Sequence, residues 1–378
     1  MVEAVREPEV RATRLAAQRL RGEPLGSLPA VVEHLLAVQS QELSPSMWGL
    51  ARRSSAGTDL HGALALLDEG TVLRTHLLRP TWHSVLPRDL RWLMTLSGPR
   101  VLRASSSTHR VYGVTEDQLE RSRDTLLTAV SRGPRTRAEL AEELALDGFE
   151  ATGVPLASFI MFAELTLGIV SGPYRGTQRT YVDLDSRVPP GFGPLGESFD
   201  REAAVVELVR RFLASRGLAS EHDLARWSGL TLTDVRAGLG ALEDQVEAFP
   251  GAGGLEGLSF WGPAGLEPVR EERGPRPRVD LLQPYDEYVS SYPVTRFLSQ
   301  GPEEGASTFL SALAVDGLVV GRWRSTTTTR ELRVETQWFR SPRKAELEAL
   351  EAEAAELARF WGRELGGVTE LGGTPTGT

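Results

Sequence analysis

The sequence predicts an α+β fold in which three tandem winged helix-turn-helix modules precede a β-rich domain with a terminal helix. The first observation is length, because 378 residues exceed what one ordinary core organises. The second is repetition, since three helices followed by two short strands occur three times before residue 270. The third is a series of strand-like runs of residues that follow a Pro/Arg-rich linker at 271–278. The expected units are 1–112, 113–198, 199–270, a β-rich domain with C-terminal helix at 279–366, and a flexible tail at 367–378.

The third module shows the plan most clearly. A helix is expected over 202–214, and Ser220 can cap a second helix over 221–228. Gly229 starts the turn, and Thr231 can cap a third helix that runs to about residue 242. Strands at 246–249 and 258–261, joined by a glycine-rich turn, form the expected wing. Such geometry also occurs as a purely structural element, so the pattern alone leaves DNA binding open.

The other units follow the same plan. In the second, helices are expected at 117–132, 138–146 and 156–166, with wing strands at 167–171 and 178–184. The first is looser, with a helix over 28–38 and strands at 73–78 and 81–86. In the last domain, strands are expected at 279–285, 309–315, 318–324 and 331–339, with a helix at 342–365 and a frayed end from 366.

Composition excludes several classes of site. There is no cysteine, the six histidines show no paired spacing, and no phosphate-binding glycine loop is present, so neither metal nor cofactor is expected. No apolar run is long enough for a membrane span, which favours a cytoplasmic protein without membrane contact. The net charge of −9 argues mildly against nucleic acid. However, arginines are clustered, and an acidic protein can still present a basic face.

Gln39-Ser40-Gln41 follows the expected helix and reads as a loop. In extended chain, residues two apart share a face, so Gln39 and Gln41 can aim two amides at one target. Each amide offers donors and an acceptor, which suits holding a water or a developing charge. Two solvated loop glutamines are the alternative interpretation of the same triplet.

Two further groups could carry chemistry. Asp286 and Glu287 lie among tyrosines, where a carboxylate could act as a general base with a shifted pKa. The favoured interpretation is structural, with both acting as acceptors for tyrosine hydroxyls or partners for arginines. His83 could titrate near neutrality, although a lone histidine in a strand is more often a hydrogen-bonded structural residue.

Four segments in order along the chain resemble the AlkZ/YcaQ family of bacterial winged-helix DNA glycosylases, which act on bulky alkyl lesions and interstrand crosslinks. The segments are residues 36–41, 75–83, 281–288 and 320–324. The resemblance implies three tandem winged helices and a β domain around a DNA-sized channel. Gln41 places the chain nearer the AlkZ type, since YcaQ-type members have Asp there. Ser40, Pro80 and the pair Ser290-Ser291 depart from the family pattern.

The resemblance also implies roles for individual residues. Gln39 and Gln41 correspond to the catalytic Gln-hydrophobic-Gln loop. The segments placed beside the channel supply the expected DNA-binding residues Arg74, Arg79, Thr81, His83, Arg322, Trp323 and Arg324. Asp286, Glu287 and Tyr288 are expected as supporting residues.

Two amides without a general acid suit one substrate class. A purine alkylated at N7 is already cationic, so its base can leave without protonation. The enzyme then has to stabilise an oxocarbenium-like sugar and place a water, which amide oxygens can do. The sequence therefore predicts a monomeric, monofunctional DNA glycosylase that excises N7-alkylated purines from duplex DNA, in alkylation repair or in self-resistance to a genotoxic natural product. The alternatives are a non-catalytic winged-helix regulatory protein and a module for protein contacts.

Overall fold

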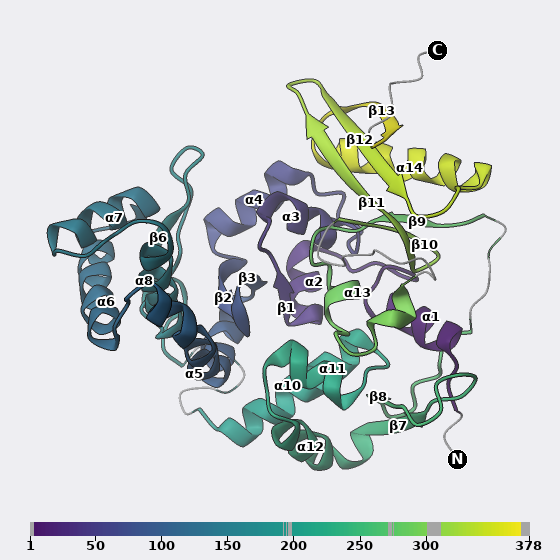
Figure 1. The fold of residues 1–378 in the computed structure, drawn as a ribbon, viewed down its shortest axis with the longest axis horizontal. Helices are drawn as coiled ribbons and strands as arrows, with labels where there is room; N and C mark the ends of the chain where they lie inside the picture. The colour runs from purple at the N-terminus through teal and green to yellow at the C-terminus, as the bar shows by residue number, and fades with distance from the viewer. Residues whose placement is uncertain are drawn as a thin grey trace.

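The computed structural model describes residues 4–191, 193, 195, 199–270, 274, 276–300 and 311–371. These residues form a mixed α+β structure with helices α1 to α14 and four separate sheets. In Figure 1 the small sheet that contains β1 lies near the middle, between the helical group at the left, the helical group below it and the sheet at the upper right.

The N-terminal unit surrounds a three-stranded sheet in the order β1-β3-β2. Both strands expected in its second half are confirmed, as β2 and β3. Its elements are α1 (Glu7–Ala17), α2 (Leu28–Leu35), β1 (Ala37–Gln39), α3 (Leu43–Ala51), α4 (Leu60–Glu69), β2 (Leu73–Leu77), β3 (Arg79–Val85) and α5 (Pro87–Val111).

The helix expected over 28–38 is too long. Helix α2 ends at Leu35, Leu36 takes a positive φ of 64°, and the next three residues form strand β1. Strand β1 pairs with β3, so backbone hydrogen bonds to a neighbouring strand replace the last helical turn. Gln39 therefore ends a strand, and of the triplet only Ser40 and Gln41 belong to the connection that Glu42 completes before α3.

The second unit has the expected three helices and, after them, the two expected strands. Thr115 and Thr136 cap α6 and α7 with reciprocal capping boxes, which explains where these helices begin. Its elements are α6 (Glu116–Ser131), β4 (Arg135–Thr136), α7 (Arg137–Leu146), α8 (Gly153–Leu165), β5 (Ile169–Ser171), β6 (Thr180–Asp183) and α9 (Leu184–Arg187). A third strand, β4, pairs with β6 and was not expected.

The third unit confirms the predicted caps and turn. Ser220 and Thr231 each accept a hydrogen bond from the third residue of the helix that they cap, and Gly229 adopts the left-handed conformation between the helices. The elements are α10 (Arg201–Arg216), α11 (Glu221–Ser228), α12 (Leu232–Ala241), the 3-10 helix η1 (Glu243–Gln245), β7 (Val246–Pro250) and β8 (Ser259–Pro263).

The last domain is a five-stranded sheet in the order β13-β12-β11-β10-β9, with α14 packed against it. Its elements are β9 (Val279–Leu281), α13 (Glu287–Ser290), the 3-10 helix η2 (Arg296–Ser299), β10 (Ala312–Val315), β11 (Leu318–Thr327), β12 (Glu331–Trp338), α14 (Lys344–Phe360) and β13 (Glu364–Glu370). Residues 309 and 310 of the strand expected at 309–315 lie outside the described residues.

The C-terminal prediction needs a correction. The terminal helix ends at Phe360, and Glu364–Glu370 form β13, parallel to β12. A frayed tail therefore does not begin at 366, because Leu365 and Val368 pack against the apolar core of this domain. Residues 372–378 of the expected tail lie outside the described residues.

Two apolar cores meet beside β1. One contains Leu36 and Ala37 together with residues of α5, α10, α11 and α12, and the other joins Val38 and α2 to the β-rich domain and α14. Consecutive residues of one short strand therefore anchor it in both cores, which fixes the position of Gln39. No described helix is long and apolar enough to cross a membrane.

Candidate active site around Gln39 and Gln41

A buried arginine, Arg216, binds the backbone that leads into Gln39. Arg216, at the end of α10, is fully buried and donates to the carbonyl oxygens of Leu35 and Ala37. These carbonyls flank Leu36, whose φ of 64° is strained for a branched, bulky residue. The arginine therefore stabilises the abrupt change from helix α2 to strand β1.

Glu287 holds the backbone of Gln39 itself. Its Oε1 accepts from Gln39 N at 3.0 Å, and its Oε2 accepts from Arg216 Nη2 at 2.9 Å and Trp227 Nε1 at 2.9 Å. Ser291 Oγ donates to the same Oε2 at 2.7 Å. Burial alone would raise the pKa of Glu287, but Arg216, Arg79 and the hydrogen bonds outweigh it and lower the pKa to about 2. Glu287 is thus an ionised, fully engaged carboxylate.

The side chain of Gln39 is held by Arg79. Arg79 Nη2 donates to Gln39 Oε1 at 3.2 Å and also approaches His83 Nε2 at 3.2 Å, while Arg79 Nη1 donates to Trp227 O at 3.1 Å. Gln39 is only 4% exposed, and its Nε2 has no hydrogen-bond partner among the residues that the structure describes. The amide is therefore fixed through its oxygen, with its donor group available.

His83 is neutral in this arrangement. It is paired with Gln39 in the β1–β3 register, and its Nδ1 lies 2.9 Å from the carbonyl oxygen of Thr81. A carbonyl only accepts, so Nδ1 carries the hydrogen and Nε2 is left as the acceptor for Arg79. Burial, then the nearby Arg79, lower the pKa of His83 to about 3. The structural interpretation of His83 is therefore favoured over titration near neutrality.

Gln41 is held less tightly than Gln39. Trp82 N donates to Gln41 Oε1 at 3.4 Å, and the Gln41 side chain is only partly buried. Its backbone is fixed by Arg74, which donates to Ser40 O at 2.7 Å and to Gln41 O at 3.1 Å and stacks over the Trp82 ring at 4.5 Å. Arg74 is 2% exposed, so it lies under the loop rather than on the surface.

Ser40 points away from the two amides. It is fully buried, and its Oγ lies 2.7 Å from Ser84 Oγ and donates to Val38 O at 3.0 Å. The neighbouring hydroxyl of Ser84 thus explains how a polar residue occupies the middle of the triplet.

The expected DNA-binding residues divide by exposure. Arg322 and Arg324 are exposed on β11 and pair with Gln337 and Glu335 of β12 at 2.6 and 2.8 Å. Trp323 between them is 8% exposed and donates to Leu282 O at 2.9 Å. Thr81 is partly buried, and its Oγ1 has no partner among the described residues.

The expected supporting residues have structural partners. Arg53 binds Asp286 through two nitrogens, at 2.7 and 3.1 Å, and both side chains are buried. Tyr288 donates to Gly317 O at 2.7 Å, and burial raises its pKa. Asp286 and Glu287 are therefore partners for arginines, as the favoured interpretation predicted. Arg53, Arg216 and Trp227 were missed, because nothing in the spacing of the sequence links them to Gln39.

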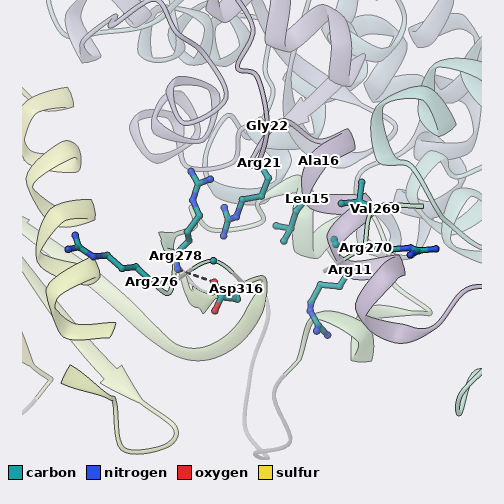
Figure 2. Close-up of a pocket in the computed structure, with 12 residues that line it drawn as sticks. Arg11, Leu15, Ala16, Arg21, Gly22, Val269, Arg270, Arg276, Arg278 and Asp316 are labelled. Carbon is teal, nitrogen blue, oxygen red and sulfur yellow. Dashed lines mark hydrogen bonds between the residues drawn. The ribbon is translucent and has the colours of Figure 1, made fainter. Parts of the chain in front are cut away.

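A second basic region lies away from this site. A cavity of about 600 Å³ lies beside α1. Figure 2 shows the arginines and Asp316 that are among its lining residues. Those arginines are Arg11, Arg21, Arg270, Arg276 and Arg278. No residue of the Gln39–Gln41 loop lines it, and Arg21 already pairs with Asp280 at 2.7 Å. No group of three potential metal ligands occurs among the described residues.

A protein-family model described as DNA glycosylase AlkZ-like matches residues 32–360, which include the glutamine loop and every element that holds it. The chain belongs to the AlkZ-like DNA glycosylase family. Its activity is therefore that of a DNA glycosylase, and its substrate is DNA. This membership supports an enzyme over the non-catalytic alternatives considered from the sequence.

Among solved structures, the AlkZ-like chain is similar to Streptomyces sahachiroi DNA glycosylase AlkZ, with a TM-score of 0.75 and 21% sequence identity. The alignment covers 97% of this chain and 100% of that one. At this identity the likeness shows a shared fold across nearly the whole molecule. No curated protein matches the sequence.

Proposed function

We propose that this glycosylase hydrolyses the N-glycosidic bond of N7-alkylated purines, bulky ones preferentially, in duplex DNA. The proposal rests on which polar groups of the loop and its surroundings are available to a substrate. Gln39 and Gln41 present side-chain amides, whereas Glu287, the carboxylate that contacts the loop, is ionised and already accepts hydrogen bonds from four donors. Such a site suits a substrate whose leaving group needs no protonation.

The proposed chemistry uses position and charge rather than acid–base transfer. Alkylation at N7 gives the purine a positive charge, and the glycosidic electrons flow to the departing base as the C1′–N9 bond breaks. Gln39 and Gln41 stabilise the oxocarbenium-like sugar and orient the attacking water, which forms the new C1′–O bond and loses its proton to solvent. Each amide oxygen accepts from one protein donor and retains a second lone pair for this purpose.

The three helix-and-hairpin units are proposed as winged-helix modules that position duplex DNA, with 1–112, 113–198 and 199–270 as their boundaries. Arg322 and Arg324, exposed on β11, are proposed as phosphate contacts from the domain at 279–366. The chain is proposed to work as a monomer, in alkylation repair or in self-resistance to a genotoxic natural product.

The proposal is tested with duplex DNA that carries one N7-methylguanine. Free base and an abasic site are expected, and an equivalent duplex with unmodified guanine should stay intact. Release of uncharged bases at comparable rates would contradict the proposed substrate class. A bulkier N7 adduct in the same sequence then tests the size preference.

Strand cleavage should not follow base removal. A lyase of the usual kind needs an amine that forms a Schiff base with the abasic sugar. The only lysine, Lys344, is 92% exposed at the start of α14. Borohydride is expected to trap no covalent complex, and an adduct on Lys344 would rule out the monofunctional assignment.

A further inference from the structure

We propose that Arg79 is a positioning residue for Gln39 rather than a phosphate contact. In this role it fixes which end of the side-chain amide is the oxygen, so that Oε1 stays beside the guanidinium with its second lone pair left for the reacting groups. The inference rests on the proposed catalytic role of Gln39. It replaces the expectation, drawn from the family resemblance, that Arg79 binds DNA.

Hydrogen-bond chemistry determines the orientation of the amide. The guanidinium of Arg79 has only donors, so each group that it contacts must offer an acceptor. Its contacts are Trp227 O, Gln39 Oε1 and His83 Nε2, at 3.1, 3.2 and 3.2 Å. The opposite amide orientation would place the Nε2 hydrogens of Gln39 against the guanidinium hydrogens. Arg79 therefore selects one of two orientations that have the same shape.

The surroundings hold Arg79 itself in place. His83 offers Nε2 as an acceptor because Thr81 O fixes the hydrogen on Nδ1. Arg79 has no ion pair with a described carboxylate, but the buried charge of Glu287 favours its ionised form and opposes the effect of burial. With both nitrogens directed at Trp227, Gln39 and His83, the guanidinium points into the protein. Arg322 and Arg324, by contrast, lie exposed on β11.

Loss of Arg79 should release the Gln39 amide to rotate. The site then spends time in an orientation that cannot make the bonds needed in the transition state. We expect Arg79→Met to slow single-turnover excision of N7-methylguanine at least about tenfold, which is less than the roughly 10²–10³ for complete loss of one preorganised contact because the Gln39 amide itself is kept. Arg79→Lys, which keeps the charge and one donor, should lie between Met and the wild type.

A double-mutant cycle separates positioning from other roles. In a Gln39→Ala background there is no amide to orient, so adding Arg79→Met should slow excision less than about twofold further. If Arg79→Met slows both backgrounds by the same factor, Arg79 acts independently of Gln39 and the inference is overturned. Melting temperatures show which variants are folded, and Arg79→Lys serves in the cycle if Arg79→Met is not.

Salt dependence provides the second readout. A lost phosphate contact makes the plot of log affinity against log salt shallower by about 0.9. Arg79→Met should leave this slope unchanged for duplex DNA, and a shallower slope would overturn the inference. Arg359→Met is the matched control, because Arg359 is 71% exposed on α14 and, among the residues that the structure describes, pairs with Glu356 alone. This control should match the wild type in both rate and slope.

The same data distinguish the two proposals. An inactive wild type, or Gln39→Ala with the wild-type rate, contradicts the proposed function and the Arg79 inference together. An active wild type and a slow Gln39→Ala variant, combined with a fully active Arg79→Met variant, contradict only the role of Arg79.

Discussion

At the residue scale, Gln39 and Gln41 are held by different means. Gln39 is buried and bound by Arg79, while Gln41 is partly exposed and accepts one long bond from Trp82 N. We expect Gln39→Ala and Gln41→Ala each to slow excision at least about tenfold, since one preorganised hydrogen bond contributes roughly 2.7–4 kcal/mol to the transition state. Single-turnover release of N7-methylguanine, with duplex affinity alongside, measures this effect.

Ser40→Ala serves as the internal control for that experiment. Its hydroxyl bonds Ser84 inside the sheet, so its loss should lower the free energy of unfolding by about 1 kcal/mol and leave excision nearly unchanged. Wild-type rates in both glutamine variants would refute the assignment. A strong loss of excision in Ser40→Ala would show that the loop backbone, rather than the amides, limits the rate.

His83 should make stability depend on pH. Its folded pKa of about 3 lies below the ordinary value of 6.5, so between these values the unfolded chain binds a proton that the folded chain lacks. Stability from this group is complete above pH 6.5 and is lost as the pH falls towards 3, at up to about 1.4 kcal/mol per pH unit. The depressed pKa of Glu287 adds a second loss on acidification, between its ordinary value of 4.5 and about 2.

Denaturant unfolding of the wild type and His83→Gln between pH 4 and 8 tests this linkage. The two stability curves should be parallel above pH 7, and the variant should lose less stability than the wild type as the pH falls towards 4. Parallel curves over the whole range would show that His83 does not contribute to the pH dependence.

At the element scale, the junction between α2 and β1 concentrates backbone strain in one residue. Leu36 has φ 64° and ψ −53°, a region in which glycine is less strained than other residues. We therefore expect Leu36→Gly to be no less stable than Leu36→Ala, because both lose the buried side chain and only glycine relieves the strain. The free energies of unfolding of the two variants test this order.

Leu35 offers the matched control for that comparison. It is equally buried but ends α2 in helical conformation, where glycine is normally about 1 kcal/mol less favourable than alanine. Leu35→Gly should therefore be less stable than Leu35→Ala. The same order at both positions would mean that Leu36 stores no strain.

At the scale of the whole molecule, a net charge of −9 has to be reconciled with DNA binding. We expect duplex affinity to fall steeply with salt, with a slope of about −0.9 per phosphate neutralised. Arg324→Met, at a position paired with Glu335 on the surface, should make the slope shallower by about 0.9, while Arg359→Met should not. Salt-independent affinity would contradict binding led by arginine–phosphate contacts.

Much of the fold follows from local signals in the sequence. The capping residues Thr231 and Ser220, together with the turn at Gly229, predict helices and breaks that the structure confirms. These signals work because a cap satisfies backbone donors within three residues of itself. Predictions from local signals are wrong at residues 36–38, because pairing with β3 overrides the helical spacing. They are also wrong at 364–370, because a strand forms there by pairing with β12.

The sequence by itself determined the chemical identity of the loop: two glutamines separated by a small residue, in a chain with one lysine and no cysteine. Tertiary structure alone decided how that loop is held. Glu287 lies 248 positions from Gln39, and Arg216 lies 179 positions from Ala37. Buried arginines and carboxylates need partners wherever the fold places them, and spacing along the chain carries no record of such pairs. For this physical reason the sequence led us to expect Arg79 as a DNA-binding residue. In the structure its guanidinium binds Gln39 inside the site.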